Sequence, residues 1–554
     1  MNNQLIYNVE DRPKLPRLLV LALQQVLAVM AATIAVPAII GLPTQMPAAI
    51  LGAGVGTIVY LLFTKFKSPV VISSSFAFLA PLSVALAFGY CGIIVGAILA
   101  GLVYVVLAII IHFAGTKWVS KLMPPVIIGP TVALIGLSLA GSAMGDIVKA
   151  SGAAVNASYN LVALLCGLIT FVTVILCSCQ KRFKSMKLIP FIIGIGAGYA
   201  VAAIFSAIGY GADVDYLKII NWQPLVSNFV DANGKFTGVT AFLNYPDFAL
   251  IEAIKEMVNG SVGPEILTAS KGAGQLLTGA GFGEIVLAFV PVALVVFAEH
   301  IADHKNLGSI INRDLVEGEP GLKRTLLGDG VGSIAGTVLG ICPNTTYGES
   351  VGCVAITKNA SVATILTAAL MCIVLSFISP IMALLQTIPN CVMGGICLTL
   401  YGFIAVSGLK MFKEVDLNDN KNLFTVSAIL IAGIGGLAIK IPYHVLAEDV
   451  MGLAVSEDGA SVVSVLVSPA GTVDKVITIT SIATALILGI CTYAILNALE
   501  KKQGREDDGA PESLVAGAVA PDANFEVGKS VVKEEESAAE EAPAEEPAEA
   551  PVEE

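Results

Sequence analysis

The stretch "ICPNTTYGESVGCVAIT" (341–357) decides the fold, because it cannot form one continuous membrane helix. It opens with Pro343, Asn344 and two threonines, and a helix-like apolar pattern resumes only after Gly348. An earlier stretch, "SPVVISSSFAFLAPL" (68–82), has the same order: β-branched residues, three serines, then a helix-like run. Extended backbone is tolerated at membrane depth only where it is buried in protein or lines a cavity. Each stretch therefore predicts a few extended residues followed by a half-helix.

The composition is that of a multispanning membrane protein. The chain has 554 residues, of which 56% are hydrophobic and 13% charged, whereas soluble domains have roughly 25% charged residues. Most of the net charge of −12 lies at the C-terminus, where residues 501–554 contain 16 acidic and 5 basic residues. That low-complexity segment has too few large apolar residues to form a core. We expect residues 499–554 to be a disordered cytoplasmic tail.

Hydropathy predicts an all-α polytopic fold of fourteen spans, since a span needs about 20 mostly apolar residues. The two interrupted stretches are the third and tenth spans. They are seven apart, which predicts two inverted repeats of seven, and interrupted segments at corresponding positions mark a transporter's binding site. The predicted spans are 17–40, 46–64, 70–87, 91–114, 124–143, 157–178, 188–208, 284–302, 325–342, 344–356, 360–384, 388–407, 422–438 and 475–498.

The loops predict an orientation. Lysine and arginine gather in alternate loops such as "QKRFKSMK" (180–187), which places both termini in the cytoplasm. No cleavable signal peptide is visible. Two long outer stretches, 209–283 and 439–474, interrupt the pattern. The first contains a hairpin signal, "FVDANGKFTGV" (229–239), and an amphipathic helix pattern, "PDFALIEAIKEMVNG" (246–260).

Enzyme and metal chemistry find little support in the sequence. The ten cysteines lie in or beside apolar spans, where cysteine is most often a small core residue. Carboxylates and imidazoles in "VVFAEHIADH" (295–304) have metal-ligand spacing, but the chain has only four histidines and no second cluster. No nucleophile–base pair or cofactor fingerprint is present, and the glycine cluster "GAGVG" (52–56) is typical of close helix packing. We expect a protein that is not an enzyme, with no cofactor and no metal.

The eighth span ends in a cluster of titratable residues. Glu299 and Asp303 are four residues apart and share one helix face, and His300 and His304 share another. An ionisable side chain inside a span is costly and marks a functional site by default. The two histidines have a simpler interpretation, as the place where the helix leaves the membrane. Glu349 falls in the first turn of the tenth-span half-helix, where the helix dipole favours a carboxylate.

These groups predict the kind of ligand. Two carboxylates would lie beside free backbone N–H groups at the two half-helix starts, near Phe76 and Gly348. A small, flat, neutral molecule with alternating N–H and C=O groups would match them, and uracil and the oxopurines have such an edge. Different classes remain open: a channel-like facilitator, an anion transporter of the same fold, or a metal transporter. The glutamates would repel an anion at the site.

Several motifs resemble the nucleobase–ascorbate transporter family, in particular its bacterial uracil permeases. They are "LALQQVLAVMAATIAVPAI" (21–39), "SSSFAF" (73–78), "PGLKRTLLGDG" (320–330) and "PNTTYGESVGCVAITK" (343–358), together with 295–304. The resemblance implies fourteen spans, with short antiparallel strands in the third and tenth. It implies a core domain (17–114 and 284–384) and a gate domain (115–208 and 385–498) through which a homodimer forms.

The resemblance also implies roles for single residues. Glu299 and Glu349 match the substrate-binding glutamates, and the backbone N–H groups of Phe76 and Gly348 match those that bind the base. Ala32 matches a small residue that lines the pocket. The family couples uptake to protons, and the residues expected to take part are Glu299, Asp303 and Asp329.

Two departures leave the substrate contested. Ser350 stands where the signature has asparagine, and Asp303 stands where close uracil permeases have histidine. Aspartate there resembles the xanthine and urate branch, whereas Glu349 is typical of uracil transporters. The sequence therefore predicts a uracil:proton symporter of the cell membrane that binds lipid and no nucleic acid. The alternative is a symporter for xanthine or another oxopurine.

Overall fold

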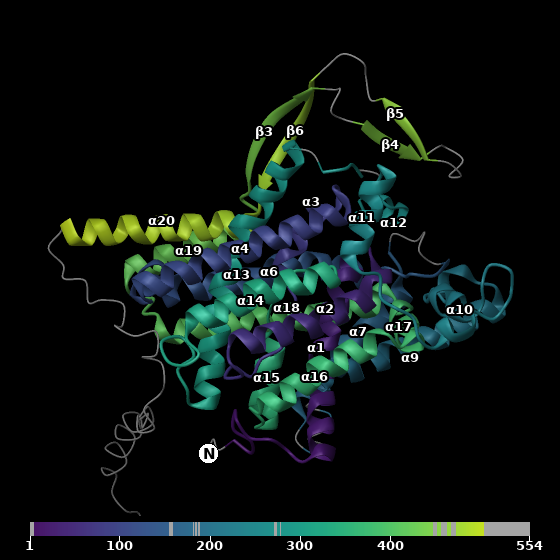
Figure 1. Cartoon of the computed structure of the whole chain (residues 1–554), viewed down its shortest axis with the longest axis horizontal. Helices are drawn as coiled ribbons and strands as arrows, with labels where there is room; N and C mark the ends of the chain where they lie inside the picture. The colour runs from purple at the N-terminus through teal and green to yellow at the C-terminus, as the bar shows by residue number, and fades with distance from the viewer. Residues whose placement is uncertain are drawn as a thin grey trace, which may run out of the picture. The chain divides into compact units, whose positions relative to one another are not determined.

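The computed structural model describes residues 5–153, 159–180, 182, 186, 189–270, 274–277, 279–446, 451–455, 462–466 and 472–502. They belong to one compact unit within Met1–Val515. Helices make up most of this unit (Figure 1). Beyond residue 502, the predicted tail lies outside the described residues.

The first half of the chain is a series of apolar helices with one short strand. Several helices begin where the sequence provides a start signal: α1 and α9 have proline in the first turn. The Asn160 side chain accepts from the N–H groups of Val162 and Ala163 at the start of α7. The elements are α1 (Leu15–Ile39), η1 (Pro43–Gln45), α2 (Met46–Phe63), β1 (Ile72–Ser74), η2 (Phe76–Phe78), α3 (Leu79–Leu86), α4 (Gly89–Ala114), α5 (Lys117–Leu122), α6 (Pro125–Asp146), α7 (Leu161–Cys179) and α9 (Pro190–Ala212).

The second half repeats this pattern of long helices and one strand that leads into a half-helix. Its third element, β2 with α15, corresponds to β1 with η2 and α3. The elements are α13 (Gly279–Ile311), α14 (Leu322–Leu339), β2 (Asn344–Thr346), α15 (Gly348–Thr357), α16 (Val362–Ser376), α17 (Ser379–Gln386), α18 (Asn390–Lys410), η6 (Met411–Glu414), α19 (Asn420–Ile434) and α20 (Ser481–Lys502).

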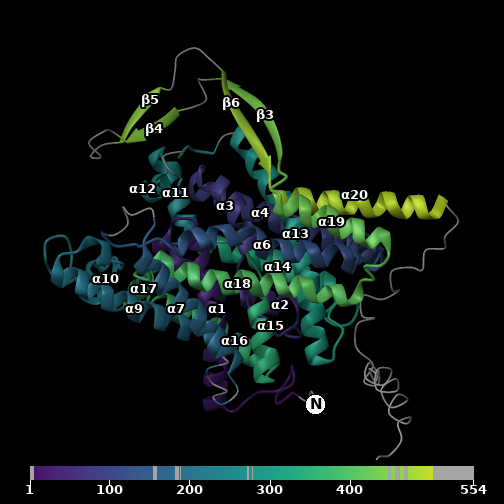
Figure 2. The ribbon, with the colours of Figure 1, turned by 180° about the vertical axis from the view of Figure 1, so that it is seen from behind.

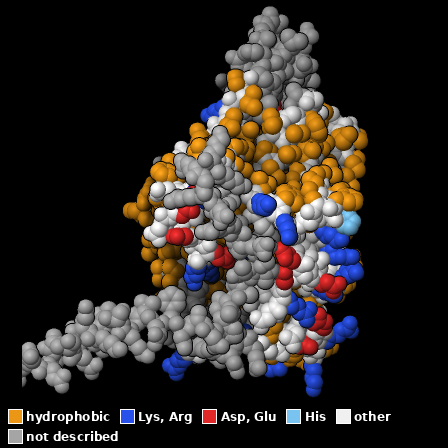
Figure 3. Space-filling view, turned by 90° about the vertical axis from the view of Figure 1, so that its left-hand side faces the viewer, with side chains coloured by type: hydrophobic (Ala, Val, Ile, Leu, Met, Phe, Trp, Pro, Cys, Tyr) orange, Lys and Arg blue, Asp and Glu red, His pale blue; other side chains and the backbone are white. Residues whose placement is uncertain are grey.

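Every predicted span overlaps a helix. Among the described residues, nine helices are long and apolar enough to cross a membrane, and three more apolar helices are shorter. Hydrophobic side chains cover the upper part of the face in Figure 3, while charged side chains gather lower down. Large hydrophobic side chains such as Val106, Ile109 and Phe113 of α4 are exposed, as expected of a multi-pass membrane protein. The count of fourteen crossings stays a prediction.

Small residues let α2 and α14 approach closely. A Cβ added at Gly52 would lie 2.5 Å from the carbonyl oxygen of Gly336, and one at Gly56 would lie 2.9 Å from that of Gly332. The prediction of close packing at "GAGVG" is thus confirmed. At this close crossing, the side-chain amide of Asn344 donates to the carbonyl of Gly52 over 2.8 Å. This bond fixes the start of β2 against α2.

The two interrupted stretches meet, as the resemblance implies. β1 and β2 form a two-stranded antiparallel sheet in which Ile72 pairs with Thr346 and Ser74 with Asn344. The Tyr347 hydroxyl also donates to the Ser74 carbonyl. The half-helices α3 and α15 begin just beyond this pair, so two segments from opposite halves of the chain converge at one place.

The two long stretches that were expected on the outer side contain elements that the sequence predicted only in part. In the 209–283 stretch, Val230 pairs with Phe236 at the expected hairpin, and α11 (Ala249–Asn259) is the expected helix. The remaining elements there are η4 (Asp215–Leu217), α10 (Gln223–Phe229), η5 (Gly238–Ala241) and α12 (Pro264–Ala269). The helix α9 extends to Ala212 and α13 begins at Gly279, so each helix runs a few residues into the 209–283 stretch.

The second outer stretch contains strands. β3 (Ile439–Leu446) pairs with β6 (Thr472–Ile479), and β4 (Met451–Val455) pairs with β5 (Val462–Leu466). Both hairpins lie outside the helices in Figures 1 and 2. The last span was predicted from residue 475, but residues 475–479 are in β6 and α20 starts only at Ser481. The alternating "VDKVITI" has strand periodicity, which a hydropathy window does not detect.

Candidate functional site

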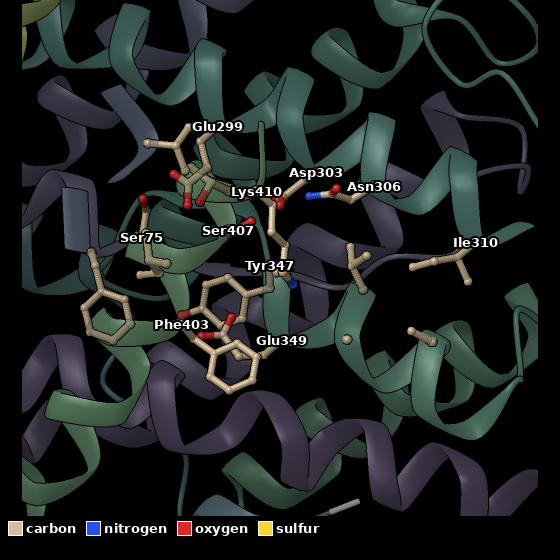
Figure 4. A pocket seen from close by; sticks show the side chains of 18 of the residues that line it. Ser75, Glu299, Asp303, Asn306, Ile310, Tyr347, Glu349, Phe403, Ser407 and Lys410 are labelled. Carbon is tan, nitrogen blue, oxygen red and sulfur yellow. The ribbon is translucent and has the colours of Figure 1, made fainter. Parts of the chain in front are cut away.

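The candidate site is a cavity of about 290 Å³ beside the β1–β2 pair (Figure 4). One wall comes from η2, β2, α13 and α15, and the other from α6 and α18. The cavity follows α13 for three turns, from Glu299 to Ile310. Its lining residues are Ser75, Phe76, Val132, Glu299, Asp303, Asn306, Ser309, Ile310, Thr345, Tyr347, Gly348, Glu349, Val351, Gly352, Ala355, Phe403, Ile404, Ser407 and Lys410.

Three carboxylates face this cavity, and they are held differently. The Thr346 hydroxyl donates to Oδ2 of Asp303 over 3.0 Å, and Asp303 is 5% exposed. Among the described residues, Oε2 of Glu299 and Oε1 of Glu349 are buried without a hydrogen-bond partner. A buried acceptor without a partner is costly. These two oxygens are therefore acceptors at the cavity that the described residues leave without a donor.

Backbone donors lie beside the carboxylates. Gly348 and Glu349 are the first two residues of α15, and the first N–H groups of a helix have no intrahelical acceptor. Gly348 lines the cavity, and a Cβ there would lie 3.7 Å from Oδ1 of Asp303. Phe76 begins η2 on the facing segment, and its ring packs edge-on against Tyr401 at 5.2 Å between centroids.

Ser350, which stands where the family signature has asparagine, connects three elements. Ser350 is fully buried in α15, and its Oγ accepts the backbone N–H of Val71, just before β1, over 3.0 Å. The Gln25 amide of α1 donates to the same oxygen. The partners of this hydroxyl thus come from α1 and from the segment before β1 rather than from the cavity.

The arrangement of interrupted segments, paired carboxylates and helix starts matches known proteins. The family model described as "Permease family" (Xan_ur_permease) matches residues 16–230 and 276–441. The chain belongs to this permease family. It is 36% identical over 442 residues to the uracil permease of Bacillus caldolyticus, which covers 79% of this chain and 90% of the relative. It is 32% identical to that of Escherichia coli K12 over 439 residues, or 78% of this chain and 88% of the relative.

Solved structures share the fold of the permease. The transmembrane domain of the cyanobacterial bicarbonate transporter BicA aligns with a TM-score of 0.50 at 13% identity, covering 77% of this chain and 97% of that domain. The murine anion transporter Slc26a9 in the inward-facing state aligns with a TM-score of 0.54 at 10% identity, covering 89% and 69%. These likenesses confirm the predicted fold class of two inverted repeats, and at such low identity they bear on the fold alone.

Five of the residues expected at the site line the cavity of the permease, and two do not. Glu299, Asp303, Glu349, Phe76 and Gly348 all contribute to its wall. Ala32 is instead fully buried within α1, and Asp329 is fully buried on α14. Neither is among the cavity-lining residues. Motif matching placed both near the site, but it cannot distinguish the wall of a cavity from the layer behind it.

The interpretation of His300 and His304 as the end of a span is wrong. The helix α13 continues to Ile311, beyond the predicted end at 302, and the two side chains are 0% and 1% exposed. Nε2 of His304 lies 2.8 Å from the Tyr60 hydroxyl, and its Nδ1 lies 2.8 Å from the His300 carbonyl. Polar partners on α2 and α14 keep this face buried, which hydropathy does not detect.

Sequence reasoning missed three polar residues that line the cavity, two of them on the wall opposite Glu299. Ser407 and Lys410 of α18 and Asn306 of α13 line the cavity (Figure 4). Lys410 is the last residue of α18, and a lysine at a span end is interpreted first as a charge that sets orientation. Its spacing of three from Ser407 was the available signal, since both then share a helix face. Within the described part of the chain, no group of three or more His, Cys, Asp or Glu side chains is placed to hold a metal.

Proposed function

We propose that this permease takes up uracil together with a proton across the cell membrane. The relatives reported above are named uracil permeases, and they are covered over most of their length. Uracil presents two N–H donors and two carbonyl acceptors around one flat ring. The site supplies the complementary set: carboxylate oxygens as acceptors and backbone N–H groups as donors.

One observation carries the proposal. The partnerless oxygens of Glu299 and Glu349 face the same cavity as the starts of η2 and α15. Leaving a buried acceptor unpaired costs about 1–3 kcal/mol, so a ligand that supplies N–H groups gains most of that free energy on binding. A cavity of about 290 Å³ is at the small end of ligand pockets, which suits a single nucleobase.

The cavity walls support alternating access between two groups of helices. The core domain (17–114 and 284–384) supplies η2, β2, α13 and α15, and the gate domain (115–208 and 385–498) supplies α6 and α18. Motion of one group past the other would expose the base first to one side and then to the other. In this proposal, both termini are cytoplasmic, residues 209–283 and 439–474 are outside, and two gate domains meet in a homodimer.

The coupled proton is assigned to Glu299 and Asp303. They lie one turn apart on α13 and face the cavity together with Glu349. Three carboxylates in one partly dry cavity repel one another, so binding of a proton by one of them favours the closed, substrate-bound state. Asp329 lies outside the cavity, and a different role for it is argued below.

The test is uptake of radiolabelled uracil by proteoliposomes that contain the purified permease. An inward proton gradient should drive accumulation, and collapse of the gradient should reduce uptake to equilibration. The matched control is Glu299→Gln, reconstituted at equal density, which should accumulate no uracil. Undiminished accumulation without a gradient would refute proton coupling, and accumulation by Glu299→Gln would refute the site.

Asp303 favours a second candidate substrate, xanthine. Asp303 is an acceptor at the cavity wall, and xanthine carries a further N–H on its imidazole ring that uracil lacks. Thermal stabilisation of the purified permease by uracil, xanthine, uric acid and ascorbate, measured side by side, separates the two. Stabilisation by xanthine but not by uracil would replace the proposed substrate with an oxopurine.

A further inference from the structure

The side chain of His300 points away from the cavity and into the layer between α13 and α14. It follows Glu299 by one residue, so the two side chains lie about 100° apart around the helix. His300 is fully buried, with Nδ1 2.7 Å from Oδ2 of Asp329 and Nε2 3.0 Å from the Thr325 hydroxyl. Both ring nitrogens therefore have partners on α14, and neither takes part in the cavity.

The contact with Asp329 requires a proton. A ring nitrogen and a carboxylate oxygen 2.7 Å apart attract each other only if a proton lies between them, because two lone pairs would repel at that distance. This holds whether the proton resides mainly on the histidine or on the aspartate. The pair is fully buried, so its proton has no direct contact with water.

Asp329 depends on this partner. Its second oxygen, Oδ1, has no hydrogen-bond partner among the described residues, and the side chain is fully buried on α14. The backbone N–H of Thr346 also interacts with this carboxyl group. Without His300, however, the buried acid would have no side-chain partner, which is a costly state. The titratable groups around the pair are His304 and Asp303 on α13, Tyr104 on α4, Tyr60 on α2 and Glu299 toward the cavity.

We propose that His300 and Asp329 are positioning residues, which share a retained proton and fix the rotation of α13 so that Glu299 and Asp303 face the cavity. The transported proton is then carried by the cavity carboxylates, and the His300–Asp329 proton stays in place through the cycle. This inference rests on the proposed proton-coupled uptake for its transport readout, but its structural part does not.

A double-mutant cycle tests the pair. His300→Leu and Asp329→Leu should each lower the thermal midpoint of the purified permease by about 5 °C or more. The double variant should lose clearly less than the sum of the two, because it leaves no unpaired buried group. His300→Asn, whose amide N–H can stand near the position of Nδ1, should recover part of the loss. The matched control is His112→Asn, an exposed histidine on α4 whose Nδ1 lies 3.1 Å from Lys323 Nζ. The asparagine oxygen can still accept from that lysine, so the midpoint should stay unchanged.

The transport readout separates positioning from proton coupling. Asp329→Asn keeps a hydrogen-bonding side chain but cannot ionise, so it should still accumulate uracil against its gradient, with a pH profile like that of the wild type. Loss of accumulation with retained equilibration would show that Asp329 carries the coupled proton and would overturn the proposal. Additive midpoints in the cycle would overturn it as well. If the wild type failed to take up uracil, the proposed function would be refuted but the pairing of His300 and Asp329 would not. The double-mutant cycle measures thermal midpoints without any substrate.

Discussion

Glu299 and Asp303 lie one turn apart on the same face of α13, but only Asp303 receives a hydrogen bond, from Thr346 over 3.0 Å. Oε2 of Glu299 has no partner among the described residues. One carboxylate is thus held by the protein before any ligand arrives, and the other is available to a ligand. The two should respond differently to the same change.

Glu299→Gln should weaken uracil binding by roughly 10- to 100-fold, because a hydrogen bond to a charged group contributes about 1.5–3 kcal/mol. Asp303→Asn should have a smaller effect on uracil affinity, since an amide oxygen still accepts from Thr346. Equilibrium binding of labelled uracil to the purified variants measures both. Glu317→Gln, an exposed carboxylate, is the control. Equal losses for the two variants would contradict the difference inferred from the structure.

Asp303→His should raise the preference for uracil over xanthine. A carboxylate accepts the additional N–H of xanthine, whereas a neutral imidazole offers one acceptor at most and introduces a donor. Competition of unlabelled xanthine against labelled uracil gives the affinity ratio for each variant. Asp303→Asn controls for loss of charge alone. An unchanged ratio in the histidine variant would mean that Asp303 does not select the base.

Gly52→Ala should destabilise the crossing of α2 and α14. Its Cβ would lie 2.5 Å from the Gly336 carbonyl oxygen, and overpacking of this kind costs about 1–3 kcal/mol. Gly141→Ala in α6 is the matched control, because nothing lies within 4 Å of its Cβ and alanine stabilises an exposed helix position by about 0.5–1 kcal/mol. Thermal unfolding in detergent compares the two, and a midpoint for Gly52→Ala at or above that of wild type would refute the close approach.

The 209–283 stretch should pack more firmly against the start of α4 at low pH, where Glu256 of α11 accepts from the backbone N–H of Tyr90. Burial raises the pKa of Glu256 above its ordinary value of 4.5, although the backbone N–H groups of Gly263 and Tyr90 favour the carboxylate. Because the pKa is higher in the docked state, Glu256 stabilises that state most below the ordinary value. This stabilisation is lost as the pH rises through the raised pKa.

Thermal midpoints across pH measure this effect. We subtract the thermal midpoint of Glu256→Gln from that of the wild type. This difference should be largest near pH 4 and should become smaller as the pH rises. Val258→Thr on the same helix is the control, because neither side chain titrates and its difference from wild type should stay constant. A difference for Glu256→Gln that grows with pH would reverse the inferred sign.

The half-helices and the cavity carboxylates were predictable from sequence, because their signals are local. Proline, serine and threonine interrupt an apolar run, and Glu299 or Glu349 inside one has few explanations other than function. The layer behind the site was not predictable in this way. His300 and His304 look like the end of a span until Asp329 and Tyr60, which lie on other helices, are seen beside them.

The opposite wall was missed for a related reason. Lys410 lies at the end of α18, and a lysine at a helix end is read first as an orientation signal. Whether it faces a cavity depends on how α18 packs against α6 and α13, which no local pattern encodes. The strands after Ile439 were missed because a mean over many residues hides a period of two.

The β1–β2 pair also has a consequence for the order in which the protein matures. Ser74 and its partner Tyr347 are 273 residues apart in the chain. At roughly 5–20 residues per second, β1 leaves the ribosome on the order of tens of seconds before its partner exists. During that interval, its backbone groups must be satisfied by water, by the insertion machinery or by neighbouring helices. The nascent first half therefore lacks the cavity that both halves form together, and a chain arrested before residue 344 should be a substrate for membrane quality control rather than a partly active carrier.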